Sequence, residues 1–177
     1  MNIFQLSTGE QVVPKSSYEQ QAYELIPDGT KVLAVVEGAS WGEYNNERHI
    51  SLKWRVMSPD SLKNRVVFGK LHVHAEKPSK SDHARTMLAT IDLLGGSKLS
   101  KVQGEVTDLE LTRCLVNTIA TIKVGLWEIA DSVKTNPDGT PKINRGNYVV
   151  GVGPRGEVAP TTAKPAVADY DDSDIPF

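Results

Sequence analysis

The sequence predicts a mainly β domain of five strands with one helical insert, and three patterns carry this prediction. Several short runs alternate apolar and polar residues, which is typical of half-buried strands. One central run repeats its apolar residues at helical spacing instead. Turn-forming Gly, Pro, Asn and Asp residues separate these runs. With 177 residues, 39% of them hydrophobic and 24% charged, the chain has the composition of one ordinary globular domain.

The first three strands are expected before the helical run. The Pro27-Asp28-Gly29 turn precedes a β-branched run over residues 31–37, and residues 42–47 supply the next turn. In the second strand an apolar face alternates with a polar and basic one, the apolar positions being Ile50, Leu52, Trp54 and Val56 and the polar ones His49, Ser51, Lys53 and Arg55. A third strand is predicted over residues 65–75, with base and aromatic residues again sharing one face.

Two helices are expected next. The longer one begins at Ser81 or Asp82, either of which can cap it, and ends at Gly95-Gly96. A shorter one begins at Thr107, because Thr107 and Glu110 have the spacing of a capping box. Strands over residues 118–129 and 147–152 follow, joined by a hairpin turn at 136–140.

Three strands, a helical insert and a β-hairpin form the chain order of an OB-fold, a five-stranded, partly open barrel that binds oligonucleotides on one strand face. Another small barrel could have the same order. The expected domain covers residues 27–153 and follows an N-terminal extension over residues 1–26. Residues 154–168 are rich in Pro and lack a hydrophobic period, so they are expected to form an extended linker.

The last nine residues are a candidate docking peptide. Four aspartates without a base precede Ile175, Pro176 and the terminal Phe177. Repulsion between like charges extends such a segment, and its apolar residues have nothing to pack on at a free end, so we expect it to be disordered until a partner binds.

This tip resembles the acidic C-terminal tail of single-stranded-DNA-binding proteins of bacteria and their phages, in which a run of aspartates ends in Ile-Pro-Phe. The resemblance implies that the tail recruits replication, recombination and repair enzymes, which hold the terminal aromatic ring and carboxylate in an apolar pocket rimmed by bases. The residues expected to bind such partners are Asp171, Asp172, Asp174, Ile175, Pro176 and Phe177.

The body, over about residues 27–152, is similar to phage single-stranded-DNA-binding proteins with OB-fold cores. The similarity is carried by the Pro-Asp-Gly entry, residues 53–56, the Asn-Arg-Val-Val-Phe run at 64–68, the Leu-rich helix before Gly95, and Lys123-Val124 ahead of the Asp138-Gly139 turn. The body does not reproduce the sequence of the tetrameric bacterial protein. The similarity implies single-stranded DNA as the ligand, bound with little regard to sequence in DNA replication, recombination or repair, without a cofactor and without catalysis.

Binding of single strands needs cations for phosphates and exposed rings on which bases stack. Expected outward strand faces and the first strand connection carry both, and the candidate DNA-binding residues are Trp41, Tyr44, Lys53, Arg55, Phe68, Lys70, His72, His74, Lys123, Trp127, Arg145 and Tyr148. Each ring could instead belong to the core, and each cation could simply be solvated.

Charge does not oppose nucleic-acid binding. The chain has 20 Lys and Arg residues against 22 Asp and Glu, but four of those acids lie in the tail, which leaves the body with a small basic excess. The single cysteine, Cys114, lies in an apolar stretch and is expected to be buried. No apolar run is long enough to span a membrane, so we expect a cytoplasmic protein, in the bacterial host if phage-encoded.

Two other classes of function stay open. A metal-dependent enzyme could use His72 and His74 with Asp82 and His83, although their spacing fixes no third ligand and neither a phosphate-binding loop nor a nucleophile elbow is present. A recombination mediator or replication adaptor would bind protein with its body and recruit enzymes with its tail. Comparing affinities for single-stranded and duplex DNA separates such an adaptor from a DNA-coating protein.

Overall fold

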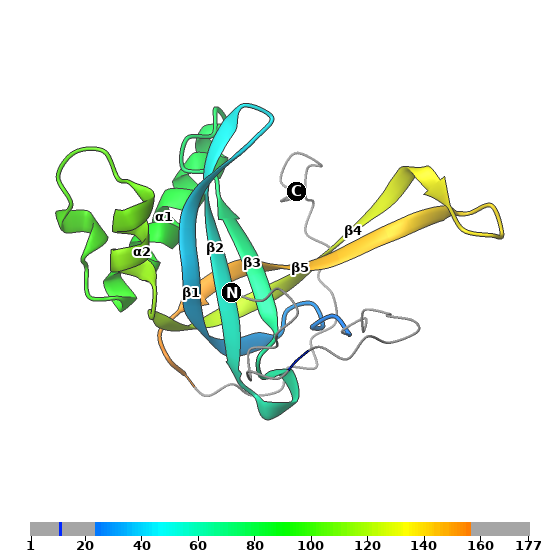
Figure 1. Cartoon of the computed structure of the whole chain (residues 1–177), viewed down its shortest axis with the longest axis horizontal. Coiled ribbons are helices and arrows are strands. Elements are labelled where there is room, and N and C mark those ends of the chain that lie inside the picture. Colours follow the sequence, from blue (N-terminus) through cyan, green and yellow to red (C-terminus); the bar gives the residue numbers. More distant parts are fainter. Residues whose placement is uncertain (1–10, 12–23, 157–177) are drawn as a thin grey trace.

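The computed structural model describes residue 11 and residues 24–156. The expected linker beyond Gly156 and the candidate docking peptide lie outside these residues. Five strands form one closed sheet in the order β1-β2-β3-β5-β4, and two helices are inserted between β3 and β4 (Figure 1). The mainly β prediction with a helical insert is therefore confirmed.

The strands β1 (Lys31–Tyr44) and β2 (Glu47–Ser58) form a long antiparallel hairpin. Its turn is Asn45-Asn46, where both residues have positive φ, a conformation that Asn tolerates and that tight hairpin turns require. The turn thus lies within the predicted range 42–47, while β1 continues to Tyr44, beyond the strand predicted over residues 31–37. The β1 register shifts between Val36 and Gly38, which marks a β-bulge.

Strand β3 (Val66–Leu71) pairs antiparallel with β2 after a short 3-10 turn, η1 (Asp60–Leu62). The prediction of a strand over residues 65–75 is wrong at its C-terminal end. The amide of Val73 donates to the carbonyl of Leu71 and that of Ala75 to His72, so the chain turns out of the sheet toward the first helix. His72 and His74 consequently lie beyond the strand.

Helix α1 (Pro78–Leu94) begins three residues before the predicted capping residues, with Pro at its first position, a place where the missing amide costs nothing. The Ser81 hydroxyl donates to the Pro78 carbonyl instead of capping the helix. The predicted end at Gly95 is confirmed. After the turn η2 (Leu99–Lys101), helix α2 (Asp108–Leu115) begins with the predicted capping box between Thr107 and Glu110.

Strands β4 (Ile119–Thr135) and β5 (Pro141–Gly153) pair antiparallel and continue past the closed sheet as a two-stranded ribbon that projects from the body (Figure 1). Both strands are longer than predicted, while the turn between Asn136 and Thr140 lies where expected. Strand β4 closes the sheet against β1, and β5 meets β3 in parallel.

The core fills the interior of the sheet and the space under the helices. All four apolar residues predicted for the inner face of β2 are buried, and Ile91, Leu111 and Leu115 of the helices pack in the same cluster. Cys114 is buried, as predicted. Within residues 24–156, no helix is long and apolar enough to cross a membrane.

A buried carboxylate joins α1 to η2. Asp92 accepts hydrogen bonds from the backbone amides of Leu99 (2.7 Å) and Ser100 (2.9 Å). Burial alone would raise the pKa of Asp92, but these amides outweigh it and hold the pKa below the ordinary 3.8.

We expect Asp92→Asn to lower the free energy of unfolding at pH 7 by about 1 to 3 kcal/mol, since an amide cannot accept both hydrogen bonds. A carboxyl with a depressed folded pKa stabilises the fold above its unfolded pKa, and this stability is lost as the pH falls from about 4 through the folded pKa. Urea unfolding at pH 7 and pH 3 should therefore show a difference between the two proteins that shrinks at pH 3. Asp82→Asn, an exposed change on the same helix, is the control, and an equal loss in both variants would contradict the role of Asp92.

Candidate nucleic-acid interface

Three aromatic rings share the outer side of the sheet. Phe68 on β3 is 54% exposed and is the register partner of Tyr148 on β5. Tyr148 pairs across the ribbon with Gly125, and Trp127 pairs with Gly146. Because side chains alternate along a strand, Trp127 lies on the same side of β4 as Gly125. The three rings therefore follow one another from β3 across β5 to β4.

Glycines hold two of these rings flat. A Cβ atom on Gly146 would lie 2.6 Å from the Trp127 indole, and one on Gly125 would lie 2.7 Å from the Tyr148 ring. Each ring thus lies directly over the backbone of the opposite strand, at a distance that only glycine permits. Their orientation is set by the fold before any ligand binds, which suits flat stacking of a base.

Cations lie beside the rings on β2 and β3. Lys53 is the register partner of Phe68, and Arg55 follows Lys53 on the same side of β2. Lys70 lies on the same side of β3 as Phe68, and its Nζ is 5.6 Å from the centroid of the Tyr44 ring. We call the side formed by these seven residues the aromatic face: Tyr44, Lys53, Arg55, Phe68, Lys70, Trp127 and Tyr148.

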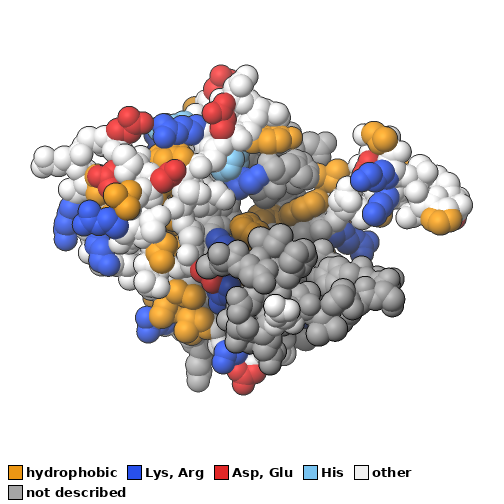
Figure 2. All heavy atoms as spheres, viewed as in Figure 1, with side chains coloured by type: hydrophobic (Ala, Val, Ile, Leu, Met, Phe, Trp, Pro, Cys, Tyr) orange, Lys and Arg blue, Asp and Glu red, His pale blue; other side chains and the backbone are white. Residues whose placement is uncertain are grey.

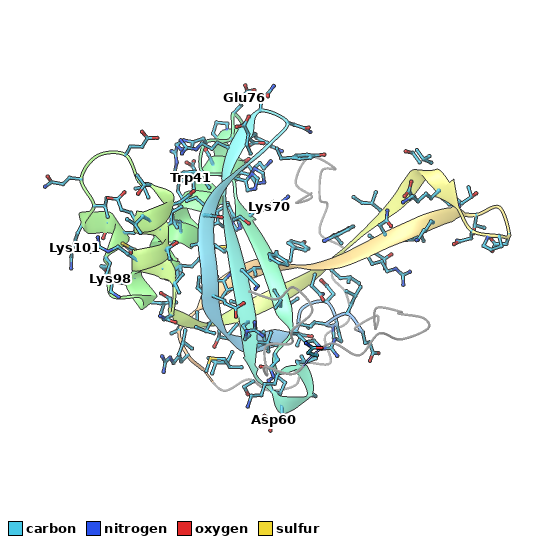
Figure 3. All side chains as sticks on the ribbon, in the orientation of Figure 1. Trp41, Asp60, Lys70, Glu76, Lys98 and Lys101 are labelled. Carbon is cyan, nitrogen blue, oxygen red and sulfur yellow. The ribbon has the colours of Figure 1, made fainter. Side chains whose placement is uncertain are left out.

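The part of the aromatic face that lies on β2 and β3 is on the side of the body from which the ribbon projects. In Figure 3, Lys70 lies on that side of the strands. Figure 2 shows hydrophobic side chains that continue from the body onto the ribbon, with a basic side chain near them. The ammonium group of Lys70 is partly withdrawn from water, and this burial lowers its pKa.

Glu37 holds two of the cations, and sequence reasoning missed it. Its carboxylate lies 2.8 Å from Lys53 Nζ and accepts a 2.7 Å hydrogen bond from Arg55 Nε. Glu37 follows buried Val36 and so lies on the outer side of β1, at the bulge that precedes Gly38. Hydrogen bonds from Lys53 and Arg55 lower the pKa of Glu37.

We expect Glu37→Gln to tighten binding of single-stranded DNA, because it frees two cations for phosphates. The affinity for oligo-dT at moderate salt should rise roughly three- to tenfold, and its dependence on salt should steepen by about one phosphate contact. Fluorescence anisotropy titrations at several salt concentrations measure both. Glu43→Gln removes the same charge from the opposite side of β1 and should change affinity less than twofold. Equal effects of the two substitutions would mean that only net charge matters.

His72 lies in a buried polar cluster beside the aromatic face. Its Nδ1 is 3.4 Å from Glu47 Oε1, its ring centroid is 5.2 Å from that of buried His49, and Lys80 of α1 also contacts Glu47. Burial lowers the pKa of both histidines, so they are neutral at physiological pH and supply no positive charge there.

Trp41 lies elsewhere, on the side of the β1–β2 hairpin that faces the helices (Figure 3), and His74 lies against it. The Trp41 indole donates to the carbonyl of Val106 (2.8 Å), its ring stacks on His74 at 5.6 Å, and the Arg48 guanidinium lies 4.3 Å above it. The two predicted residues therefore contact each other but do not join the aromatic face. Trp41 and Tyr44 were expected in the connection between the first two strands, but both belong to β1 and lie on opposite sides of it.

The two remaining predicted cations lie on opposite sides of the sheet. Lys123 lies on the side of β4 that carries Trp127, beside Lys31 of β1. Arg145 is paired in register with Glu128, and their side chains form a 2.8 Å ion pair on the opposite side of the ribbon. The predicted partner-binding residues of the tail lie outside the described residues.

No family model matches this chain, and no curated protein is significantly similar to it. Within residues 24–156, no group of three or more His, Cys, Asp or Glu side chains could hold a metal ion.

Proposed function

We propose that this chain is a single-stranded-nucleic-acid-binding protein with an OB-fold. The order β1-β2-β3-β5-β4 and the helices between β3 and β4 support this fold. OB-folds bind oligonucleotides on the outer side of strands 2 and 3, between the loops that join strands 1 to 2 and 4 to 5. In this chain those positions belong to Lys53, Phe68 and Lys70, between the Asn45-Asn46 turn and the ribbon.

More particularly, we propose a single-stranded-DNA-binding protein of the phage type, which coats DNA and recruits enzymes through its acidic tip. The observation that carries the proposal is the aromatic face, where four rings adjoin the cations of β2 and β3. Stacked rings recognise any base, and cations recognise any phosphate, so the face suits binding without sequence preference. The Ile-Pro-Phe terminus adds the means of recruitment.

The test is a titration of the whole chain with labelled oligo-dT and with duplex DNA of equal length at two salt concentrations. We expect oligo-dT to bind more tightly, with an affinity that falls as salt rises because counterions are released. Preference for duplex, or binding that ignores salt, would contradict the proposal. Binding of neither DNA would favour an adaptor whose body contacts protein.

We expect Phe177→Ala to abolish recruitment while leaving DNA affinity within twofold, because it removes the ring that anchors the tip in its partner. Deleting residues 169–177 should abolish recruitment and also tighten DNA binding at low salt, since four negative charges leave the chain. Surface plasmon resonance against purified replication, recombination and repair enzymes of the host measures recruitment. Thr161→Ala in the linker is the control, and partner binding that survives the deletion would exclude the docking role.

A further inference from the structure

A cleft of 410 Å³ opens between β3, β5 and α1, next to the aromatic face. Its origin lies in the closure of the sheet: among the described residues, β3 and β5 share one register pair, Phe68 with Tyr148. Beyond that pair the described residues of β3 and β5 are not paired as neighbouring strands, and α1 packs against both of them. The volume lies within the range of small-molecule sites, which commonly enclose about 300 to 1,000 Å³.

The cleft has an apolar floor, and the ammonium-bearing side chains of Lys70 and Lys80 belong to its lining. Leu71, Met87 and Val149 are among the apolar residues that line the floor, and Leu52 and Trp54, which also belong to the lining, are fully buried. Lys70, His72, Lys80 and His83 also line the cleft, and no Asp or Glu does. Lys80 contacts Glu47, which lies outside the lining. A ligand that suits both parts has a planar or apolar portion and carries negative charge.

The cleft and the aromatic face share two residues. Lys70 and Tyr148 line the cleft and also belong to the face. A single strand of DNA that passes over Phe68 and Tyr148 therefore runs along the mouth of the cleft. Its nucleotides have the required chemistry, since each combines a planar base with a phosphate.

We propose that the cleft holds one nucleotide, with its base against the apolar floor and its phosphate near Lys70 and Lys80. This inference rests on the proposed function when the nucleotide belongs to a bound strand. A free mononucleotide has the same chemistry, and the experiment below separates the two sources.

His83→Trp tests the cleft without disturbing the core, because His83 is exposed yet lines the opening. Thr86→Trp is the matched control, since Thr86 is exposed on the same helix and does not line the cleft. Thermal melting verifies that both variants fold. The affinities of both variants and the unchanged chain are measured with oligo-dT, and amide resonances of residues 79–87 are followed by NMR during addition of oligo-dT or of dTMP.

We expect His83→Trp to bind oligo-dT at least about fivefold more weakly than Thr86→Trp, the loss of roughly one stacked base. Oligo-dT should also shift the resonances of residues 79–87 in the unchanged chain. Equal affinities of the two variants, with tight binding by the unchanged chain, would overturn the cleft inference and leave the proposed function standing. If neither the unchanged chain nor the two variants bound oligo-dT, the proposed function would fail. Shifts with dTMP would then assign the cleft to free nucleotides, and their absence would overturn it.

Discussion

Replacing both Phe68 and Trp127 by alanine is expected to weaken binding of oligo-dT by about thirtyfold or more, because each base stacked on a ring contributes about 1 to 3 kcal/mol. The two rings lie on β3 and β4, at either end of the three-ring row, so their loss leaves Tyr148 alone between them. Anisotropy titrations with labelled oligo-dT at low salt measure the effect.

The fold should tolerate this double substitution, since Phe68 is 54% exposed and Trp127 lies on the outer side of the ribbon. Leu109→Ala, which removes an exposed apolar side chain from α2, is the control and should bind DNA normally. The salt dependence of the double variant should match that of the unchanged chain, because no cation is lost. An affinity within twofold of the unchanged chain would show that the rings are not the platform.

Trp54→Ala is expected to lower the free energy of unfolding by about 3 to 5 kcal/mol, the range found when a buried Trp or Phe is truncated. Trp54 is the largest fully buried side chain, and its register partners are Val36 on β1 and Val67 on β3. Truncation therefore empties the centre of the sheet and removes part of the cleft floor.

Urea unfolding followed by far-UV circular dichroism measures this loss. Small domains have a total stability of about 5 to 15 kcal/mol, so the variant should unfold at much lower urea concentration. Met57→Ala on the same strand is the control, and its loss should be small because Met57 is 39% exposed. A loss below about 1 kcal/mol in Trp54→Ala would mean that the core collapses around the gap.

Residue alternation and helix-capping patterns predicted strands and helices well where residues close in sequence decide the local structure. The alternation in β2 identified its buried face, and the spacing of Thr107 and Glu110 identified the start of α2. Helix α1 began earlier than predicted because Pro78 suits a first helical turn, and no side-chain cap was needed.

The site was predictable only in part, because tertiary structure decides which side chains meet. Phe68, Lys70, Trp127 and Tyr148 were all predicted, and alternation along their strands places them together. Alternation from buried Val36 places Glu37 on the outer side, but its ion pairs with Lys53 and Arg55 depend on the pairing of β1 with β2. Trp41 was predicted in the connection between the first two strands, whereas β1 continues to Tyr44 and the bulge turns Trp41 to the side of Ile50.

If the chain binds single strands as proposed, Glu37 should make that binding take up a proton. In the free chain the hydrogen bonds from Lys53 and Arg55 hold the pKa of this carboxyl below its ordinary value. When phosphates engage those cations, the carboxyl loses its partners and gains negative neighbours, so its affinity for a proton rises. The proposed function therefore predicts that binding takes up a proton at acidic pH and that the affinity for single strands rises as the pH falls through that range.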